Sequence, residues 1–275
     1  MKKLFSLVLS LLFILSLASC NKEDTLIVYT EAGFAPFEYV SGNKVVGVDV
    51  DIMNKVGEKL GKKVVFKNVS FDIIVDTVSQ GKATNVGAAG LSITDERLEK
   101  VNFSQVYYQA NLYVIYNKDS GVSSKTMTDG STGVYWSSLK TNKGIGIQEG
   151  TTADIFLSDE IEKGGSLEGA KKTGFTELGV AVSAIGKTID YVIIDELPAK
   201  QLIKGNPNLA CLPLYYEGDE TTGDILAFDR YAICVTKGKD ELLDAINEVL
   251  TELLIEDENG INGIEKLVNK HLGIE

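Results

Sequence analysis

The residues best suited to hold a small charged ligand lie between Gly90 and Arg97. Thr94 can cap a helix whose first turn carries two acidic residues, and Arg97 lies near that helix start. A planar guanidinium can bind a carboxylate through two parallel hydrogen bonds. Gly90 would let a ligand approach the backbone closely, and Ser92 offers a hydroxyl group. The alternative is that Arg97 only pairs with an acidic neighbour in that turn.

Histidine and cysteine chemistry find little support in the sequence. His271 is the only histidine, and the cysteines are Cys20, Cys211 and Cys234. Without a cluster of these ligands, we expect no transition-metal site, no histidine-based acid–base catalysis and no cofactor. Cys211 and Cys234 both lie among apolar residues, which favours buried single thiols over a disulfide between them.

Two glycine patterns resemble nucleotide-binding motifs but lack their context. Residues 181–188 fit a loose P-loop pattern, yet an apolar helix-like stretch precedes them and a strand follows, the reverse of the required order. Gly144, Gly146 and Gly150 are spaced one residue too long for a dinucleotide fingerprint. We therefore expect no nucleotide site at either place.

The N-terminus predicts an exported, lipid-anchored protein. Lys2 and Lys3 precede an apolar run of 15 residues, shorter than the roughly 20 residues needed to span a membrane. The pattern is typical of a secretory signal peptide over residues 1–19. Cys20 directly follows small residues and resembles the lipobox cysteine of bacterial lipoproteins, which is acylated after cleavage. Residues 20–24 would then be the lipidated cysteine and a polar tether.

Charge excludes some partners. The chain of 275 residues has 27 basic and 39 acidic side chains, and the signal peptide would remove two of the basic ones. Such an acidic surface repels phosphate backbones, so we expect no nucleic-acid partner. It also argues against a second, electrostatic grip on anionic lipid.

Strand-like and helix-like segments alternate along the rest of the chain. Apolar strands are predicted at residues 26–29, 63–67, 145–148 and 191–194, and helical stripes at residues 52–60, 71–78 and 242–254. This alternation predicts an α/β protein with mostly parallel sheets, in which ligands bind at the carboxyl ends of the strands. Residues 117–143 are rich in polar residues and glycine, and predict a long surface loop that contains a little local structure.

The segment from Gly90 to Tyr108 resembles the signature of the family 3 solute-binding proteins, the amino-acid receptors of ATP-driven importers. In that family the motif runs Gly-Met-Ser/Thr-Ile-Thr-Pro-Glu-Arg and is followed by Phe-Ser-x-Pro-Tyr. The resemblance extends over almost the whole mature chain. The matching residues are Gly90, Ser92, Ile93, Thr94, Glu96, Arg97, Phe103, Ser104 and Tyr107, and the other matching segments are residues 34–39, 47–51, 148–152, 191–195 and 259–273.

The resemblance implies a role for each candidate residue. Arg97 would bind the α-carboxylate of an amino acid, helped by Ser92 and by Thr151 and Thr152 at a helix N-terminus, a natural anion site. Asp195 would accept the α-ammonium group.

The side chain of the ligand would be held by other residues. Phe34 and Phe71 would sandwich it, although Phe71 also completes a helical core stripe. Glu31 aligns with a position that contacts basic or amide side chains in some relatives. We therefore expect a preference for Arg, Lys, His or Gln, with a solvent-exposed Glu31 as the alternative.

The resemblance implies the two-lobed periplasmic-binding-protein type II fold. Lobe 1 would take residues 25–108 and 231–275, and lobe 2 residues 112–226, with hinges near 108–111 and 227–230. Ligand would close the lobes, and the closed form would dock on the membrane permease of an ABC importer. We expect a monomer, anchored through Cys20 and facing the periplasm or the cell exterior.

Two other functions are compatible with such a fold. One is an enzyme, for example a dehydratase that acts on a cyclised aromatic precursor, because fold alone does not decide function. The other is a lipoprotein that senses an amino acid without feeding transport. Few candidate acid–base groups surround the motif, which favours a binding protein over the enzyme.

Overall fold

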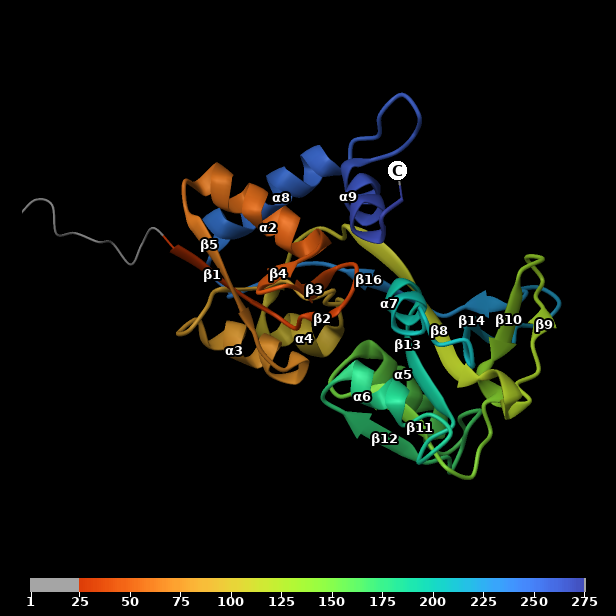
Figure 1. Cartoon of the computed structure of the whole chain (residues 1–275). Helices are drawn as coiled ribbons and strands as arrows, with labels where there is room; N and C mark the ends of the chain where they lie inside the picture. Colours follow the sequence, from red (N-terminus) through yellow and green to blue (C-terminus); the bar gives the residue numbers. More distant parts are fainter. Residues whose placement is uncertain (1–24, 275) are drawn as a thin grey trace, which may run out of the picture.

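The computed structural model describes residues 25–274, which form two α/β lobes lying side by side (Figure 1). The predicted signal peptide, the lipidated Cys20 and the tether lie outside the described residues. We call lobe 1 the part built on the five-stranded sheet and lobe 2 the part built on the nine-stranded sheet. Within residues 25–274, no helix is both long and apolar enough to cross a membrane.

The sheet of lobe 1 brings together strands from both ends of the chain, in the order β5-β1-β6-β17-β7. The first three strands are parallel, and β17 joins them antiparallel. The strands are β1 (Thr25–Thr30), β5 (Lys63–Asn68), β6 (Val86–Gly87), β7 (Asn102–Phe103) and β17 (Cys234–Val235). A small antiparallel sheet follows β1 and consists of β2 (Gly33–Phe34), β3 (Glu38–Ser41) and β4 (Lys44–Val46).

Helices cover both faces of this sheet. The helices of lobe 1 are α2 (Val48–Leu60), α3 (Ile74–Gln80), α4 (Asp95–Lys100), α8 (Asp240–Leu253) and α9 (Gly263–Leu272). In α2 the stripe of Ile52, Met53 and Val56 is fully buried, and Gly61 ends the helix in the left-handed conformation. Helices α2 and α8 lie on one face, whereas α3 and α4 lie on the other (Figure 1).

Lobe 2 has a mixed sheet rather than a mostly parallel one. Its main path runs β12-β11-β13-β8-β14-β10-β9, and β8 pairs antiparallel with both β13 and β14. This follows from the connectivity, because β8 carries the chain in from lobe 1 and so runs opposite to its neighbours. The strands are β8 (Tyr108–Asn117), β9 (Lys125–Thr126), β10 (Thr132–Tyr135), β11 (Ile145–Gln148), β12 (Lys172–Phe175), β13 (Tyr191–Asp195), β14 (Leu209–Tyr216), β15 (Ile225–Leu226) and β16 (Phe228–Tyr231).

The helices of lobe 2 are α5 (Thr152–Ile161), α6 (Leu178–Ser183) and α7 (Glu196–Leu202). Both α5 and α7 begin directly after a turn or strand end, so that their N-termini face lobe 1 (Figure 1). Parallel strands β11 and β13 end at the same edge, which places Gln148 and Asp195 near each other.

The prediction of a long surface loop over residues 117–143 is wrong in part. This segment contains β9 and β10, and β10 pairs in parallel with β14. Its apolar residues Val134, Trp136 and Leu139 are buried in the core of lobe 2. Burial of these three side chains fixes a segment whose composition is otherwise that of a loop.

Two strands connect the lobes. β8 leads into lobe 2 and β16 leads back, and the two pair antiparallel, with Asn111 opposite Phe228 and Ala110 opposite Asp229. Both predicted hinge segments therefore lie side by side in one ladder.

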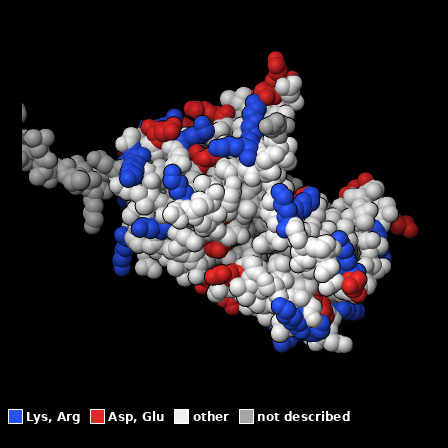
Figure 2. Space-filling model, in the orientation of Figure 1, with Lys and Arg blue, Asp and Glu red and all other residues white. Residues whose placement is uncertain are grey.

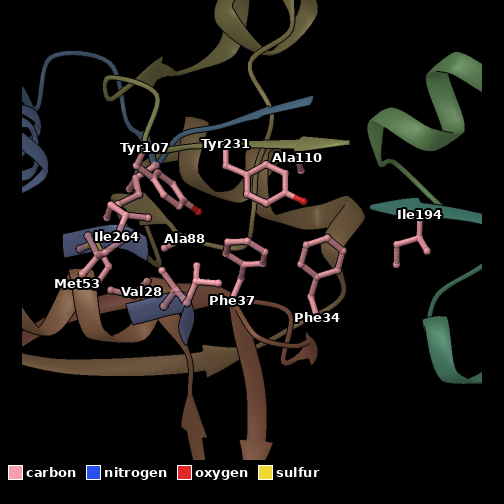
Figure 3. Close-up of a cluster of buried hydrophobic side chains, with 14 of the residues drawn as sticks. Val28, Phe34, Phe37, Met53, Ala88, Tyr107, Ala110, Ile194, Tyr231 and Ile264 are labelled. Atoms are coloured by element: carbon pink, nitrogen blue, oxygen red, sulfur yellow. The ribbon is translucent and has the colours of Figure 1, made fainter. Parts of the chain in front are cut away.

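A buried aromatic cluster lies beneath this ladder in lobe 1. Phe37 and Tyr231 are fully buried with ring centroids 5.0 Å apart, and Phe34 lies at 6.1 Å from each of them. Figure 3 shows the Tyr231 hydroxyl pointing toward the side on which Phe34 and Ile194 lie. Elsewhere, Cys211 and Cys234 are both free, Cys234 being buried and Cys211 half-buried.

Candidate functional site

A cavity between the lobes collects most of the predicted ligand-binding residues. Lobe 1 contributes Phe34, Phe71, Gly90 and Ser92, and lobe 2 contributes the N-terminus of α5 and the end of β13 with Asp195. The cavity measures about 20 Å³, which is close to the space that one water molecule needs. An amino acid can therefore enter only when the lobes move apart, as expected for a hinged pair of domains.

Arg97 lies on α4 in lobe 1 and reaches across to lobe 2. Thr94 caps this helix by accepting a hydrogen bond from the Arg97 backbone N–H. The guanidinium donates to the Ser92 carbonyl at 2.6 Å and to the Gly150 carbonyl of lobe 2 at 2.8 Å. The side chain is 7% exposed, and its burial lowers the pKa of Arg97, which the nearby Asp229 counteracts. The alternative in which Arg97 only pairs with Asp95 or Glu96 is wrong, because neither forms an ion pair with it among the described residues.

Gly90 is required by its conformation and by its neighbours. Its φ of +54° is the left-handed region that favours glycine. A Cβ at this position would come within 2.9 Å of the Phe34 ring. The Gly90 N–H donates to Asp49, a buried residue of α2. Asp49 therefore holds the backbone beside the cavity in place.

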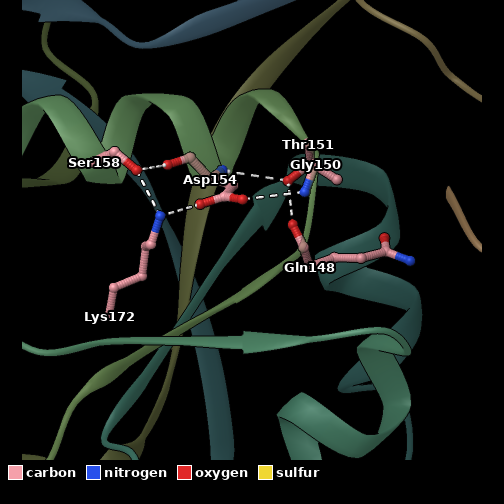
Figure 4. Close-up of polar contacts among 6 residues, drawn as sticks. All are labelled: Gln148, Gly150, Thr151, Asp154, Ser158 and Lys172. Atoms are coloured by element: carbon pink, nitrogen blue, oxygen red, sulfur yellow. Dashed lines mark hydrogen bonds and ion pairs between the residues drawn. The ribbon is translucent and has the colours of Figure 1, made fainter. Parts of the chain in front are cut away.

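The N-terminus of α5 forms one wall of the cavity. The Thr151 hydroxyl donates to the Gln148 carbonyl at 2.8 Å and accepts from the Asp154 backbone N–H, so it serves the turn itself (Figure 4). The Asp154 carboxylate also accepts a hydrogen bond from the Gly150 N–H and forms an ion pair with Lys172, with Nζ 2.5 Å from Oδ1. The backbone N–H groups at the start of α5 that have no partner in the turn are the ones that can bind an anion.

Asp195 lines the same cavity at the end of β13. The residue is 7% exposed, and its Oδ1 is buried without a hydrogen-bond partner among the described residues. Burial raises the pKa of Asp195 well above its ordinary value and the charge of Asp229 raises it further, whereas the neighbouring Tyr231 hydroxyl lowers it. A buried, unsatisfied carboxylate is costly, and a cation in the cavity would satisfy it.

Asp229 is a site residue that sequence reasoning missed. It lies on β16, is 5% exposed, and accepts a hydrogen bond from the Thr152 hydroxyl. Burial raises the pKa of Asp229, and hydrogen bonds from Thr152 and Ser92 partly offset this. Its segment was predicted only as a hinge. The signal in the sequence is an acidic residue between the aromatic residues of the short strand Phe228–Tyr231.

The two predicted aromatic residues differ in setting. Phe34 is 8% exposed and packs in the aromatic cluster with one edge on the cavity. Phe71 opens a short 3-10 helix, is half-buried, and packs against the core cluster that contains the α3 stripe of Ile74, Val75 and Val78. The Arg97 guanidinium lies 5.6 Å from the Phe71 ring centroid, a cation–π contact. Phe71 therefore supports Arg97 and lines the cavity.

Glu31 lies beyond the cavity, in a cleft of about 710 Å³ at the mouth between the lobes. Glu177 and Leu178 of lobe 2 line the same cleft, and Leu178 also lines the cavity. Burial raises the pKa of Glu31, partly offset by a hydrogen bond from Gln148, and its Oε2 has no partner among the described residues. Glu31 is therefore half-buried in this cleft rather than fully exposed. Figure 2 shows acidic side chains where the lobes meet on the visible face.

Gln148 is a second residue that sequence reasoning left without a role. It is 2% exposed, lines the cavity and donates to the Thr176 carbonyl at 3.1 Å. Gln148 therefore lies between the cavity and the mouth cleft that Glu31 lines. No group of three or more His, Cys, Asp or Glu side chains within residues 25–274 is arranged to hold a metal ion.

Two α/β lobes, joined by two crossing strands around a cavity that both of them line, define a hinged ligand-binding protein. The chain belongs to the bacterial extracellular solute-binding proteins, family 3, whose family model matches residues 26–271. This membership confirms the resemblance drawn from the Gly90–Tyr108 motif. It also confirms the interpretation as a binding protein rather than an enzyme.

Individual relatives agree with this assignment. The chain is 27% identical to the arginine-binding extracellular protein ArtP of Bacillus subtilis, over 98% of both chains. It is 29% identical to a probable histidine-binding protein of Campylobacter jejuni, over 76% of this chain and 74% of that protein.

Among solved structures, an amino acid ABC transporter substrate-binding protein of Streptococcus pneumoniae bound to L-arginine is similar, with a TM-score of 0.73 and 26% identity. The match covers 91% of this chain and 95% of that one. The predicted two-lobed α/β fold is thereby confirmed.

Proposed function

We propose that this protein captures a free L-amino acid outside the cytoplasm and delivers it to the permease of an ABC importer. The observation that carries the proposal is a cavity between the lobes that Asp195 lines, beside a buried Arg97 whose guanidinium donates to the Ser92 and Gly150 carbonyls. Arg97 is a fixed cation, and the start of α5 adds backbone donors for the α-carboxylate. Asp195 offers a free acceptor to the α-ammonium group.

A basic amino acid suits the site best, and L-arginine is the first candidate. Three acidic residues of the protein, Glu31, Asp195 and Asp229, lie in or around the site, whereas its basic residue is Arg97. A cationic side chain that extends from the cavity past Gln148 would meet Glu31 and Glu177 in the mouth cleft. The arginine-binding relatives in Bacillus subtilis and Streptococcus pneumoniae support this choice.

A thermal-unfolding screen against the twenty amino acids tests the proposal. The chain from Asn21 onward is suitable, since the described fold begins at Thr25. A ligand at 100 times its Kd adds about 2.7 kcal/mol to the stability of the folded state. We expect a shift with L-arginine or another basic amino acid, and no shift in Arg97→Ala. A protein freed of carried-over ligand that responds to none of them would refute the proposal.

Anchoring through Cys20 is part of the proposal and has its own test. A mature chain that carries acyl groups on Cys20 should sediment with membranes, whereas Cys20→Ala should not. Mass spectrometry of the N-terminal peptide would identify the acyl groups. A soluble, unmodified mature wild-type chain would refute the anchor and leave the binding function standing.

A further inference from the structure

The strands of lobe 1 begin at an edge of the sheet that lies opposite the ligand cleft. Strands β1, β5 and β6 are parallel, and Thr25 at the start of β1 pairs with Lys63 at the start of β5. Strand β17 runs antiparallel to β6, so the residues that follow β17 lie at the same edge. Glu31 and Val69, which line the mouth cleft, follow the other ends of β1 and β5. We call the edge at which β1, β5 and β6 begin the amino edge.

Lysine side chains gather at the amino edge. A hollow of about 840 Å³ opens there, and Lys62, Lys82 and Lys239 line it together with Thr25. These three lysines and Lys63 are exposed, and the ion pairs within residues 25–274 are formed by other lysines. Figure 2 shows basic side chains over the end of lobe 1 at which β1 begins. The four ammonium groups are therefore free to meet an anionic partner.

The charge of this edge is opposite in sign to that of the whole molecule. Asp240 and Glu241, at the start of α8, are the acidic residues that line the hollow, against its three lysines. Lys63 adds a further positive charge, whereas the chain as a whole has 27 basic and 39 acidic side chains. The acidic excess therefore lies on the rest of the molecule. The total charge argues against an electrostatic contact with anionic lipid, but it does not describe this edge.

The amino edge is also the part of lobe 1 that an anchor on Cys20 would bring to the membrane. Four residues separate Cys20 from Thr25, so a lipid on Cys20 keeps the start of β1 within about 17 Å of the bilayer. Salt screens exposed charges over about 8 Å under physiological conditions, so the lysines act on the headgroups once the edge touches them. A strand of six residues such as β1 is about 20 Å long, and the mouth cleft lies beyond its far end.

We propose that the lysines of the amino edge bind the anionic phospholipid headgroups of the membrane that carries the anchor, and so hold lobe 1 with the ligand cleft facing away from the bilayer. This inference rests on the anchoring through Cys20 that belongs to the proposed function. The lipid attaches the protein, and the lysines orient it. Repulsion between the same headgroups and the acidic remainder of the molecule favours the same orientation. Ligand then enters the cleft from the side of the solvent.

Lysine acetylation measured by mass spectrometry tests this orientation. The acylated protein is placed in vesicles of phosphatidylcholine alone, or of equal parts phosphatidylcholine and phosphatidylglycerol. Lys163, Lys187 and Lys204 of lobe 2 are exposed and form no ion pair among the described residues, so they are internal controls. We expect acetylation of the four amino-edge lysines to slow in the anionic vesicles only, and high salt to abolish this protection. The lobe 2 lysines should react equally in both kinds of vesicle.

Two variants with the same change of charge isolate the position of the lysines. The edge variant carries Lys62→Gln, Lys82→Gln and Lys239→Gln, and the control variant carries the same substitution at the three lobe 2 lysines. Lys63 is present in both variants and reports the orientation. We expect it to lose its protection in the edge variant and to keep it in the control variant, because each lysine near an anionic surface contributes about fivefold to binding. L-Arginine binding, at the opposite edge of the sheet, should be unchanged in both variants and shows that they are folded.

Equal acetylation of the amino-edge lysines in neutral and anionic vesicles, or equal protection of Lys63 in the two variants, would overturn the inference. Protection in whole cells but in neither kind of vesicle would assign the edge to an acidic protein partner and would overturn it as well. A mature chain without acyl groups on Cys20 would refute the anchor, and this inference with it. A wild-type protein that binds no amino acid would instead refute the binding function and leave the orientation standing.

Discussion

Two pairs of buried acidic residues lie in this protein, and they differ in what surrounds them. Glu38 and Asp49, the lobe 1 pair, are 0% and 1% exposed, and Asp195 and Asp229, the cleft pair, are 7% and 5% exposed. Asp49 is satisfied by the Tyr107 hydroxyl at 2.5 Å and the Gly90 N–H at 3.0 Å. In the cleft pair, Asp195 keeps an unpartnered oxygen that faces a cavity.

The comparison teaches that burial of a carboxyl group does not by itself indicate a ligand site. Neither Glu38 oxygen meets an N–H or O–H donor among the described residues, but burial raises the pKa of Glu38 well above its ordinary value. The proton that Glu38 then holds can hydrogen-bond to Asp49, so the lobe 1 pair is complete within one lobe. The cleft pair is contributed by lobe 2 and the hinge, and under the proposed function the ammonium group of the ligand would complete it.

The largest expected effect is on the stability of lobe 1. Asp49→Ala leaves the Tyr107 hydroxyl and the Gly90 N–H as buried donors without an acceptor. We expect it to lower the free energy of unfolding by about 3 kcal/mol, measured by urea denaturation. If Asp49→Ala were as stable as the wild type, the structural role of the lobe 1 pair would be wrong.

The next effect is on ligand binding through the cleft pair. Asp195→Asn removes the charge that would accept the ammonium, and should weaken L-arginine about a hundredfold in calorimetry. Stability without ligand should stay unchanged or rise, because the change removes an unsatisfied buried carboxylate. A large loss of stability with L-arginine binding intact would show that Asp195 has a structural role, like the lobe 1 pair, and does not bind the ligand.

Glu31 extends the comparison to a half-buried carboxyl group outside both pairs, at the mouth of the cleft. Glu31→Gln removes its charge and keeps its shape, so L-arginine should bind about tenfold more weakly and L-glutamine should change less. Calorimetry with both ligands measures the difference. Unchanged L-arginine binding would show that the basic side chain does not reach this residue.

The smallest expected effect is a pH dependence of stability from the lobe 1 pair. Burial raises the pKa of Asp49 from 3.8 to about 6. Between these two values the folded protein binds a proton that the unfolded chain does not. This contribution is therefore present at low pH and is lost as the pH rises through about 6. It should add about 1 kcal/mol to stability between pH 7 and pH 5.

Glu38→Gln isolates this contribution from those of other ionisable groups. A glutamine amide donates to Asp49 without adding a second acidic group, so the pKa of Asp49 should fall and the pH dependence should flatten. Urea denaturation at pH 5, 6 and 7 in both proteins measures the difference. Parallel pH profiles for wild type and variant would show that the pair does not titrate in this range.

The sequence alone was enough for the family, the fold class and most of the cavity. The motif around Arg97 consists of local features, namely a helix cap, a left-handed glycine and a hydroxyl, and each of these forms from residues close in the chain. The end of β13 at Asp195 is predictable for the same reason, since an apolar strand stops at a charged residue. These features need no knowledge of distant contacts.

Only the tertiary structure decided which polar groups face each other. Asp229 is next to Thr152 and Ser92 because β16 returns beside β8 and places residues far apart in sequence around one point. The position of Trp136 in the core and the partly antiparallel sheets depend on the same return of the chain. Local periodicity carries no information on these pairings, because they depend on strand order and on the approach of the two lobes. Which polar groups gather around the cavity is therefore a property of the folded chain.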